Sequence, residues 1–182
     1  ALRRQRPYRP APMPAANLIP LDAVDPALVE ALLDRAFEPE RHTRTAYKVR
    51  EGMDWLPGLS FAALDDEEML VGTIQCWPVA LTDPAGRAHP MIMVGPVAVL
   101  PEHQSQGYGK ALMTASLAAL DPRAPLPQVM IGDPEYYGRW GFTNASTQGW
   151  SLPGPYEKHR LLVRCDNPAV LPREGMLGPW GA

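Results

Sequence analysis

The chain has 182 residues, of which 46% are hydrophobic and 20% charged, a mixture typical of one globular domain that excludes a wholly disordered chain. Proline is unusually frequent at 22 residues, about 12% against a usual 5%, and together with 15 glycines it excludes a bundle of long helices. The net charge is −3. Four arginines lie among the first ten residues and the remainder is net acidic, which argues against a nucleic-acid-binding domain.

No apolar run approaches the length of about 18 residues that a membrane span needs, and the N-terminus lacks the apolar core of a signal peptide. Cys76 and Cys165 lie far apart and outside any Cys/His cluster, which favours a reducing compartment and buried, structural thiols. The scattered histidines and lone cysteines lack metal-ligand spacing, so no metal is expected. We therefore expect a cytoplasmic monomer or homodimer that binds neither a membrane nor nucleic acid.

The predicted elements alternate between short strands and helices. In chain order, the pattern predicts a strand at 17–19, helices at 26–37 and 43–50, strands at 59–64, 69–81 and 91–100, a helix at 107–120, a strand at 128–131, a helix at 133–140, and strands at 142–150 and 158–165. Asp25-Pro26 and Asp133-Pro134 each combine an N-cap with a proline at the first helical position. The polar helix at 43–50 suggests a lid.

The order of these elements predicts the fold class. The strand at 91–100, the helix at 107–120 and the strand at 128–131 form a βαβ unit, which implies a parallel pair with a right-handed crossover. The other strands follow one another through short turns and should be antiparallel. We therefore expect an α/β fold with a mixed, mostly antiparallel sheet and helices on both faces. Residues 17–166 are predicted to form a single domain between a flexible tail, 1–16, and a C-terminal tail, 167–182.

The stretch from Val94 to Ala111 carries the most informative motif. A buried strand ends at Leu100, and the sequence QSQGYG then opens a helix. The glycines let a ligand approach the backbone, and the free N–H groups of a helix start attract phosphate. The glycines by themselves are also compatible with a simple helix start. The P-loop and the GxGxxG dinucleotide fingerprint are both excluded, because Ala111 follows Gly109-Lys110 and the third glycine is missing.

This segment resembles motif A of the GNAT superfamily, the acetyl-coenzyme A-dependent N-acetyltransferases. The motif, [QR]xxGx[GA] after a VxVxP strand, is matched by Gln104 to Gly109 behind Val97 to Pro101. The stretch YYGRWGF, from Tyr136 to Phe142, is similar to the family's FYxxxGF signature. The resemblance covers about residues 17–165, is closest to bacterial members described only as predicted acetyltransferases, and implies a sheet that splays at its central parallel pair.

The resemblance implies acetyl-CoA as the acyl-donor cosubstrate. The residues expected to bind it are Val97, Ala98, Val99, Gln104, Ser105, Gln106, Gly107, Tyr108, Gly109, Lys110 and Tyr137. The backbone of Val97 and Val99 should pair with the pantetheine amides, the N–H groups of 105–110 should bind the pyrophosphate, and the side chain of Gln104 should brace the loop. Gly95-Pro96 independently predicts a break in the sheet ladder just before Val97, although the strand could also simply end early.

Tyr137 is the one predicted catalytic residue, because it holds the place of the family's tyrosine beside the coenzyme thiol. It would stabilise the leaving thiolate by a hydrogen bond; the alternative is aromatic packing. Its neighbour Tyr136 is expected in the core. The general base stays open between Glu102, His103 and His89, each of which is also compatible with a surface loop, and a water chain.

The predicted function is transfer of an acetyl group from acetyl-CoA to a primary amine, on a small molecule or a peptide N-terminus, by direct attack. The alternative is a catalytically idle acyl-CoA-binding sensor or regulatory module, which would have no need of a thiolate donor. Acceptor selection is expected from residues 38–56 and 150–158. Their aromatic residues Trp55, Trp150 and Tyr156 would either face the acceptor or anchor their loops.

Overall fold

The computed structural model describes residues 17–181, so the predicted N-terminal tail lies outside the described residues. An eight-stranded mixed sheet has the order β1-β2-β3-β4-β5-β7, and β8 pairs with both β3 and β6. The strands are β1 (Asn17–Pro20), β2 (Phe61–Leu64), β3 (Leu70–Thr82), β4 (Ala88–Val99), β5 (Gln128–Ile131), β6 (Gly149–Ser151), β7 (Leu161–Arg164) and β8 (Glu174–Pro179).

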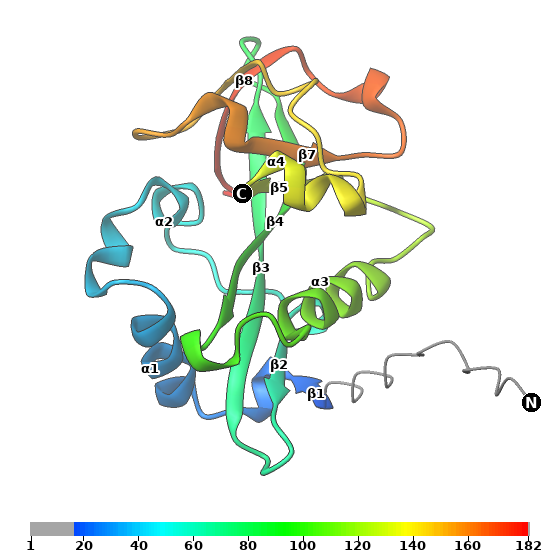
Figure 1. The fold of residues 1–182 in the computed structure, drawn as a ribbon. Coiled ribbons are helices and arrows are strands. Elements are labelled where there is room, and N and C mark those ends of the chain that lie inside the picture. The colour runs from blue at the N-terminus through cyan, green and yellow to red at the C-terminus, as the bar shows by residue number, and fades with distance from the viewer. Residues whose placement is uncertain (1–16, 182) are drawn as a thin grey trace, which may run out of the picture.

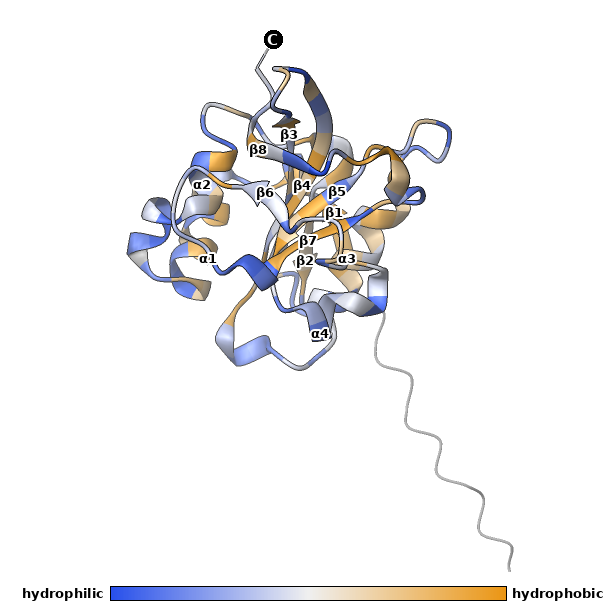
Figure 2. Cartoon of the chain, turned by 90° about the horizontal axis from the view of Figure 1, so that it is seen from above, coloured by the Kyte–Doolittle hydropathy of each residue, from blue (hydrophilic) through white to orange (hydrophobic). Residues whose placement is uncertain are grey.

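The helices cover both faces of this sheet. They are α1 (Pro26–Ala36), α2 (Thr45–Val49), α3 (Tyr108–Ala118) and α4 (Pro134–Tyr137). In Figure 1 the sheet is seen along its edge, with α1 and α2 on one side and α3 and α4 on the other. In the view from above, the hydrophobic strands β4, β5 and β7 lie between these helices (Figure 2). The predicted α/β class, with a mixed sheet and helices on both faces, is confirmed.

Helix α1 begins and packs as its sequence predicts. The Asp25 carboxylate accepts a hydrogen bond from the Ala27 N–H at 2.9 Å, and Pro26 occupies the first helical position. Val29, Leu32 and Leu33 are buried on the face toward the sheet. The spacing of three and four residues between apolar side chains is therefore what fixes this helix against the core.

The centre of the sheet contains the parallel pair that the βαβ unit predicts. Strands β4 and β5 are parallel, but their register covers only two pairs, Ile92 with Gln128 and Met93 with Val129. On the other side of β4, the ladder to β3 shifts register between Ile74 and Cys76, which oppose Val97 and Val94. The two ladders are thus disturbed at Gly95-Pro96, and the predicted break before Val97 is confirmed.

Helix α2 is not the polar lid that its sequence suggests. It is shorter than predicted and follows a 3-10 turn at Pro39–Thr43. Val49 is fully buried, and Thr45 and Arg50 are also buried. The Thr45 hydroxyl donates a hydrogen bond to the Pro155 carbonyl at 2.5 Å. These contacts anchor the helix as a fixed wall, because Thr45 and Arg50 are buried and only Lys48 of its polar residues is exposed.

The predicted strand at 142–150 is mostly absent. Only Thr143 forms a bridge, to Val163, before the short strand β6. Gly141 has a φ of 92°, and the Thr147 hydroxyl bonds to the Asn144 and Leu161 carbonyls. A turn residue and a side chain that satisfies backbone groups therefore replace the regular ladder, although the apolar and aromatic composition resembles that of a strand.

The predicted C-terminal tail is wrong for residues 174–179, which form β8. This strand pairs antiparallel with β3 from Val79 to Thr82. Leu177 is 1% exposed, and a Cβ at Gly175 would lie 2.8 Å from the Leu81 side chain. Glycine is therefore present because the backbone of β8 packs closely against β3. From the sequence alone, the many proline and glycine residues of this segment resemble a flexible tail.

Candidate functional site

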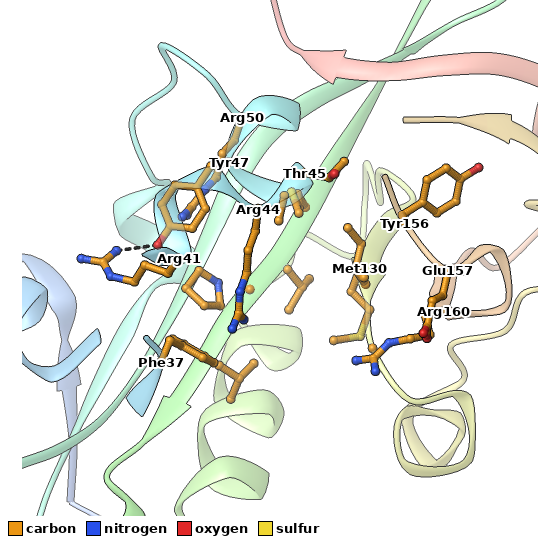
Figure 3. Close-up of a pocket in the computed structure, with 18 of the residues that line it drawn as sticks. Phe37, Arg41, Arg44, Thr45, Tyr47, Arg50, Met130, Tyr156, Glu157 and Arg160 are labelled. Atoms are coloured by element: carbon orange, nitrogen blue, oxygen red, sulfur yellow. Dashed lines mark hydrogen bonds between the residues drawn. The ribbon is translucent and has the colours of Figure 1, made fainter. Parts of the chain in front are cut away.

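A cavity of about 970 Å³ opens where β4 and β5 separate. One side of it is formed by the β4 backbone from Met93 to Val97 and by the end of β5 with the following turn, 130–133. The opposite walls are α2 with the turn before it and the segment 155–160 that precedes β7. Figure 3 shows side chains from both walls pointing toward the space between them. The short β4–β5 ladder therefore leaves room for a ligand beside the strand.

The backbone groups of β4 alternate between its two neighbours. Leu100 donates its N–H to the Val71 carbonyl at 2.9 Å, and the register pairs Ala98 with Thr73. In an antiparallel ladder every second residue is hydrogen-bonded to its partner, so the polar groups of Val97 and Val99 point away from β3, toward the side where β5 has ended. The backbone polar groups of Ala98, another residue predicted to bind the coenzyme, point toward β3 instead.

The glycine-rich loop follows β4 and leads into α3. Ser105 and Gly107 have φ values of 64° and 87°, and Gly107 caps the helix. The first helical hydrogen bond runs from the Ala111 N–H to the Gly107 carbonyl at 3.0 Å. The preceding helical N–H groups therefore have no partner of this kind, and the helix dipole adds positive potential beside them. These N–H groups belong to Tyr108, Gly109 and Lys110.

Other predicted residues of this loop differ in their exposure. Gln104, Ser105, Gln106 and Lys110 are exposed. The Gln104 amide lies 3.4 Å from the Val99 carbonyl, a long hydrogen bond that connects the loop to the strand as predicted. The loop contributes no lining to the cavity, whereas Val97 and Tyr137 both do. The structure thus brings these two residues together and places the loop at the far end of β4.

Tyr137 is held in place by the turn that joins β5 to α4. The Asp133 carboxylate caps α4 by accepting from the Glu135 N–H at 3.0 Å. A Cβ at Gly132 would lie 2.5 Å from Cε2 of the Tyr137 ring, so only glycine permits the ring to pack there. Burial is the main cause that raises the pKa of Tyr137. Its phenol consequently stays protonated at neutral pH and can donate a hydrogen bond.

Tyr136 is not a core residue as predicted. It is half-buried and lines the cavity. Its ring lies edge-on to that of Tyr137, with centroids 4.9 Å apart, and the Arg139 guanidinium lies 4.3 Å from its centre. The apolar core is instead contacted by Tyr137, the last residue of α4, and by Trp140 in the 3-10 turn that follows.

The proposed bases do not lie in the cavity. Glu102 forms an exposed ion pair with Arg35, and the His89 ring lies 2.8 Å from Asp83 near the β3–β4 turn. His103 does not line the cavity either. The carboxylates that do are Asp133 and Glu157.

Both segments predicted to select the acceptor contribute to the cavity walls, but their aromatic residues have different positions. Tyr156 lines the cavity, and its hydroxyl donates to the Trp150 carbonyl at 2.7 Å. Trp150 is 1% exposed and belongs to the core. Trp55 lines a second, smaller cavity of about 260 Å³ between α1 and β3.

Sequence reasoning missed the residues that give the cavity its charge. They are the arginines Arg41, Arg44, Arg50 and Arg160. The first three lie within or next to the predicted helix at 43–50, but Arg41 and Arg50 are nine residues apart and would lie on opposite sides of a regular α-helix. Nothing in the sequence therefore indicated that these side chains share a cavity.

Between residues 17 and 181, no group of three or more His, Cys, Asp or Glu side chains could hold a metal ion. Of the helices described, none combines the length and apolar character that crossing a membrane requires.

Known proteins with the same architecture include acetyltransferases. The model of the acetyltransferase (GNAT) domain matches residues 22–145. The uncharacterized N-acetyltransferase YhbS of Escherichia coli K12 is 31% identical over 148 residues, which cover 79% of this chain and 84% of that protein.

Solved structures support the same relationship. The crystal structure of the Escherichia coli GNAT family N-acetyltransferase YhbS, in complex with CoA, aligns with a TM-score of 0.68 and 26% identity, covering 94% of this chain and 93% of that one. A Brucella melitensis GNAT acetyltransferase, in complex with acetyl-CoA, shares the fold with a TM-score of 0.57 and 24% identity, covering 88% and 92%. From the family model and the YhbS relative together, it follows that the chain belongs to the GNAT acetyltransferases.

Proposed function

We propose that this acetyltransferase moves an acetyl group from acetyl-CoA to a primary amine bound in the 970 Å³ cavity. The observation that carries the proposal is the early end of the β4–β5 ladder at Met93 and Val129. It leaves the backbone polar groups of Val97 without a strand partner among residues 17–181, beside a cavity that also contains Tyr137. The Val99 N–H points to the same side, while the Val99 carbonyl accepts the long hydrogen bond from Gln104. The pantetheine arm would pair with these groups as an added strand does, which brings its thioester to Tyr137.

The phosphate end of the coenzyme fits the loop that follows β4. Gly107 and Ser105 turn the chain with positive φ angles, and the N–H groups at the start of α3 are free of helical partners. A diphosphate bound there would gain several charge-assisted hydrogen bonds and the favourable end of the helix dipole. The CoA and acetyl-CoA in the two related structures support this choice of ligand.

The chemistry that this arrangement permits is direct transfer. The amine nitrogen attacks the thioester carbonyl carbon, the carbon–sulfur bond breaks, the thiolate leaves with that electron pair, and the amine gives its proton to solvent. The Tyr137 hydroxyl would donate to the departing sulfur. Because burial raises its pKa further above that of a thiol, it stabilises the thiolate by a hydrogen bond instead of transferring its proton completely.

The cavity favours catalysis over the alternative function of an idle acyl-CoA sensor. A sensor needs a site for the coenzyme only, whereas here two walls, α2 and the segment 155–160, enclose additional space next to Tyr137. That space has the size of a small-molecule site. An acceptor amine is the ligand that would use it.

Calorimetry with acetyl-CoA, followed by assays of free-thiol release with a panel of amines, tests the proposal. We expect saturable coenzyme binding and amine-dependent release of CoA. Tight binding without turnover on any amine would favour the sensor instead. Failure to bind acetyl-CoA would overturn both functions.

A further inference from the structure

Arg50 is a buried cation at the edge of the cavity. The residue is 6% exposed, and its guanidinium is stacked between two aromatic rings, 4.1 Å from the centre of Tyr47 and 3.9 Å from that of Trp77. Its Nη1 atom is buried and has no hydrogen-bond partner among the described residues. The two rings fix the orientation of the guanidinium, but the N–H donors at Nη1 have no acceptor in the described chain.

Arg41, nearby on the same wall, provides an internal comparison. It is equally buried, at 3% exposed, yet it forms ion pairs with Glu30 at 2.5 Å and Asp34 at 3.1 Å. Although burial acts to lower it, these hydrogen bonds raise the pKa of Arg41 above its ordinary value. For Arg50, burial prevails and lowers the pKa to about 10, so the group is still a cation at neutral pH. Among the described residues, Arg41 thus has carboxylate partners and Arg50 has none.

The other charged residues that line the cavity are also mainly positive. Arg44 and Arg160 also line it, and neither forms an ion pair within residues 17–181. Of the two carboxylates in the lining, Asp133 caps α4 and Glu157 lies 3.8 Å from His159. Figure 3 shows the guanidinium of Arg44 between the labelled residues of α2 and Met130, with that of Arg160 below Met130 in the view. The walls around the acceptor space therefore carry a surplus of positive charge.

We infer that the acceptor is an amine that also carries a carboxylate, and that Arg50 binds this carboxylate. The inference rests on the proposed acetyl transfer. A guanidinium fixed by stacking matches a carboxylate with two parallel hydrogen bonds, and a buried cation without a counter-ion gains most from such a partner. Helix α4, which ends at Tyr137, and β5 lie on the other side of β4 from α2 (Figure 1), and residues of all three elements line the cavity. The acceptor would thus bind with its carboxylate at α2 and its amine toward the thioester.

Pairs of α-amino acids and their carboxamides test this inference, because each pair differs only in the carboxylate. The carboxamide has the less basic amine and would react better if the site did not recognise charge. We expect kcat/KM to favour the acid by about 10-fold or more, in line with hydrogen bonds between charged groups. In Arg50→Met the KM for the acid should rise about 10- to 100-fold, while kcat, the carboxamide kinetics and acetyl-CoA affinity change little. Arg50→Lys should restore only part of the preference.

The Tm of thermal unfolding distinguishes a binding role of Arg50 from a structural one. If Arg50 were structural, its substitution would lower the Tm. Methionine can fill the space between the two rings without a buried charge, so Arg50→Met should leave the Tm unchanged or raise it. Arg41→Met is the matched control, because it removes an equally buried arginine that has two carboxylate partners, and it should lower the Tm.

Carboxamides that react as well as the acids in the wild type, or a lower Tm in Arg50→Met than in Arg41→Met, would overturn the inference. Either result leaves the proposed acetyl transfer intact as long as some amine is acetylated. If no amine is acetylated, the deciding measurement is binding of the amino acids to the CoA-loaded protein. The change in fluorescence of Trp77, whose ring stacks on Arg50, reports this binding. Binding lost in Arg50→Met supports the inference, and no binding to the wild type contradicts it.

Discussion

The hydroxyl of Tyr137 is the single group on which the proposed chemistry depends. In Tyr137→Phe the ring and its packing against Trp140 stay, so acetyl-CoA affinity should hold within about twofold. The hydrogen bond to the leaving thiolate is lost, and removing one positioned donor typically lowers turnover about 10²–10³-fold. Since a thiolate leaves more easily than an oxyanion, we expect about 100-fold in kcat by steady-state kinetics. Turnover within about twofold of wild type would show that Tyr137 only packs.

Gly132 controls the same hydroxyl from the strand side. In Gly132→Ala the new methyl group would lie 2.5 Å from the Tyr137 ring, so the ring must move away from the thioester. We expect kcat to fall about 10-fold or more, since small misplacements of a catalytic group are costly. Gly138→Ala is the control, because a Cβ there meets nothing within 4 Å.

A double-mutant cycle separates this effect from a general disturbance of the site. If Gly132 acts through the Tyr137 hydroxyl, adding Gly132→Ala to Tyr137→Phe should lower kcat little further. Additive losses would instead assign Gly132 a role independent of the phenol.

At the scale of elements, the loop between β4 and α3 should bind the coenzyme phosphates. Gly107→Val and Gly109→Val should each abolish acetyl-CoA binding in calorimetry. At Gly107 the φ of 87° also disfavours any side chain, whereas at Gly109 a Cβ would only touch Val99 at 3.9 Å. A side chain at position 109 should therefore disturb the folded protein little, although it would fill the space that a bound diphosphate needs.

Gly86→Val is the control for backbone strain in this comparison. Gly86 has a φ of 85° in the turn between β3 and β4, and a Cβ there meets nothing within 4 Å. It should cost about 1–3 kcal/mol of unfolding free energy without loss of acetyl-CoA affinity. Coenzyme binding retained in both loop variants would refute the assignment of the loop.

How far the sequence predicts an element depends on whether the cause is local. The cap at Asp25, the apolar spacing of α1 and the disturbance at Gly95-Pro96 all depend on neighbouring residues, and each was predicted correctly. The segment 142–150 was not, because the Thr147 hydroxyl bonds to Leu161, a partner 14 residues away. The cavity walls were only partly predicted for the same reason, since α2 and the segment 155–160 are joined by the bond from Thr45 to Pro155.

At the scale of the whole molecule, β8 completes the sheet and covers the second half of β3. Leu177 is 1% exposed opposite Leu81, while the adjacent Met176 is 47% exposed. Leu177→Ala should lower the free energy of unfolding by about 2–5 kcal/mol, measured by urea denaturation. Met176→Ala, the matched control, should change it by no more than about 0.5 kcal/mol. Equal effects of the two variants would mean that the strand contributes little to folding.

If acetyl-CoA binds where the β4–β5 ladder ends, as proposed, the incomplete ladder would couple the amount of folded enzyme to the supply of that donor. A ligand that binds only the folded chain stabilises it in proportion to the logarithm of its concentration, by about 2.7 kcal/mol at 100 times the dissociation constant. Acetyl-CoA bound beside Val97 and Val99 would stabilise the fold in this way, at the point where the ladder between β4 and β5 is incomplete. Cells short of acetyl-CoA would then hold an enzyme that opens more often and is degraded faster by proteases.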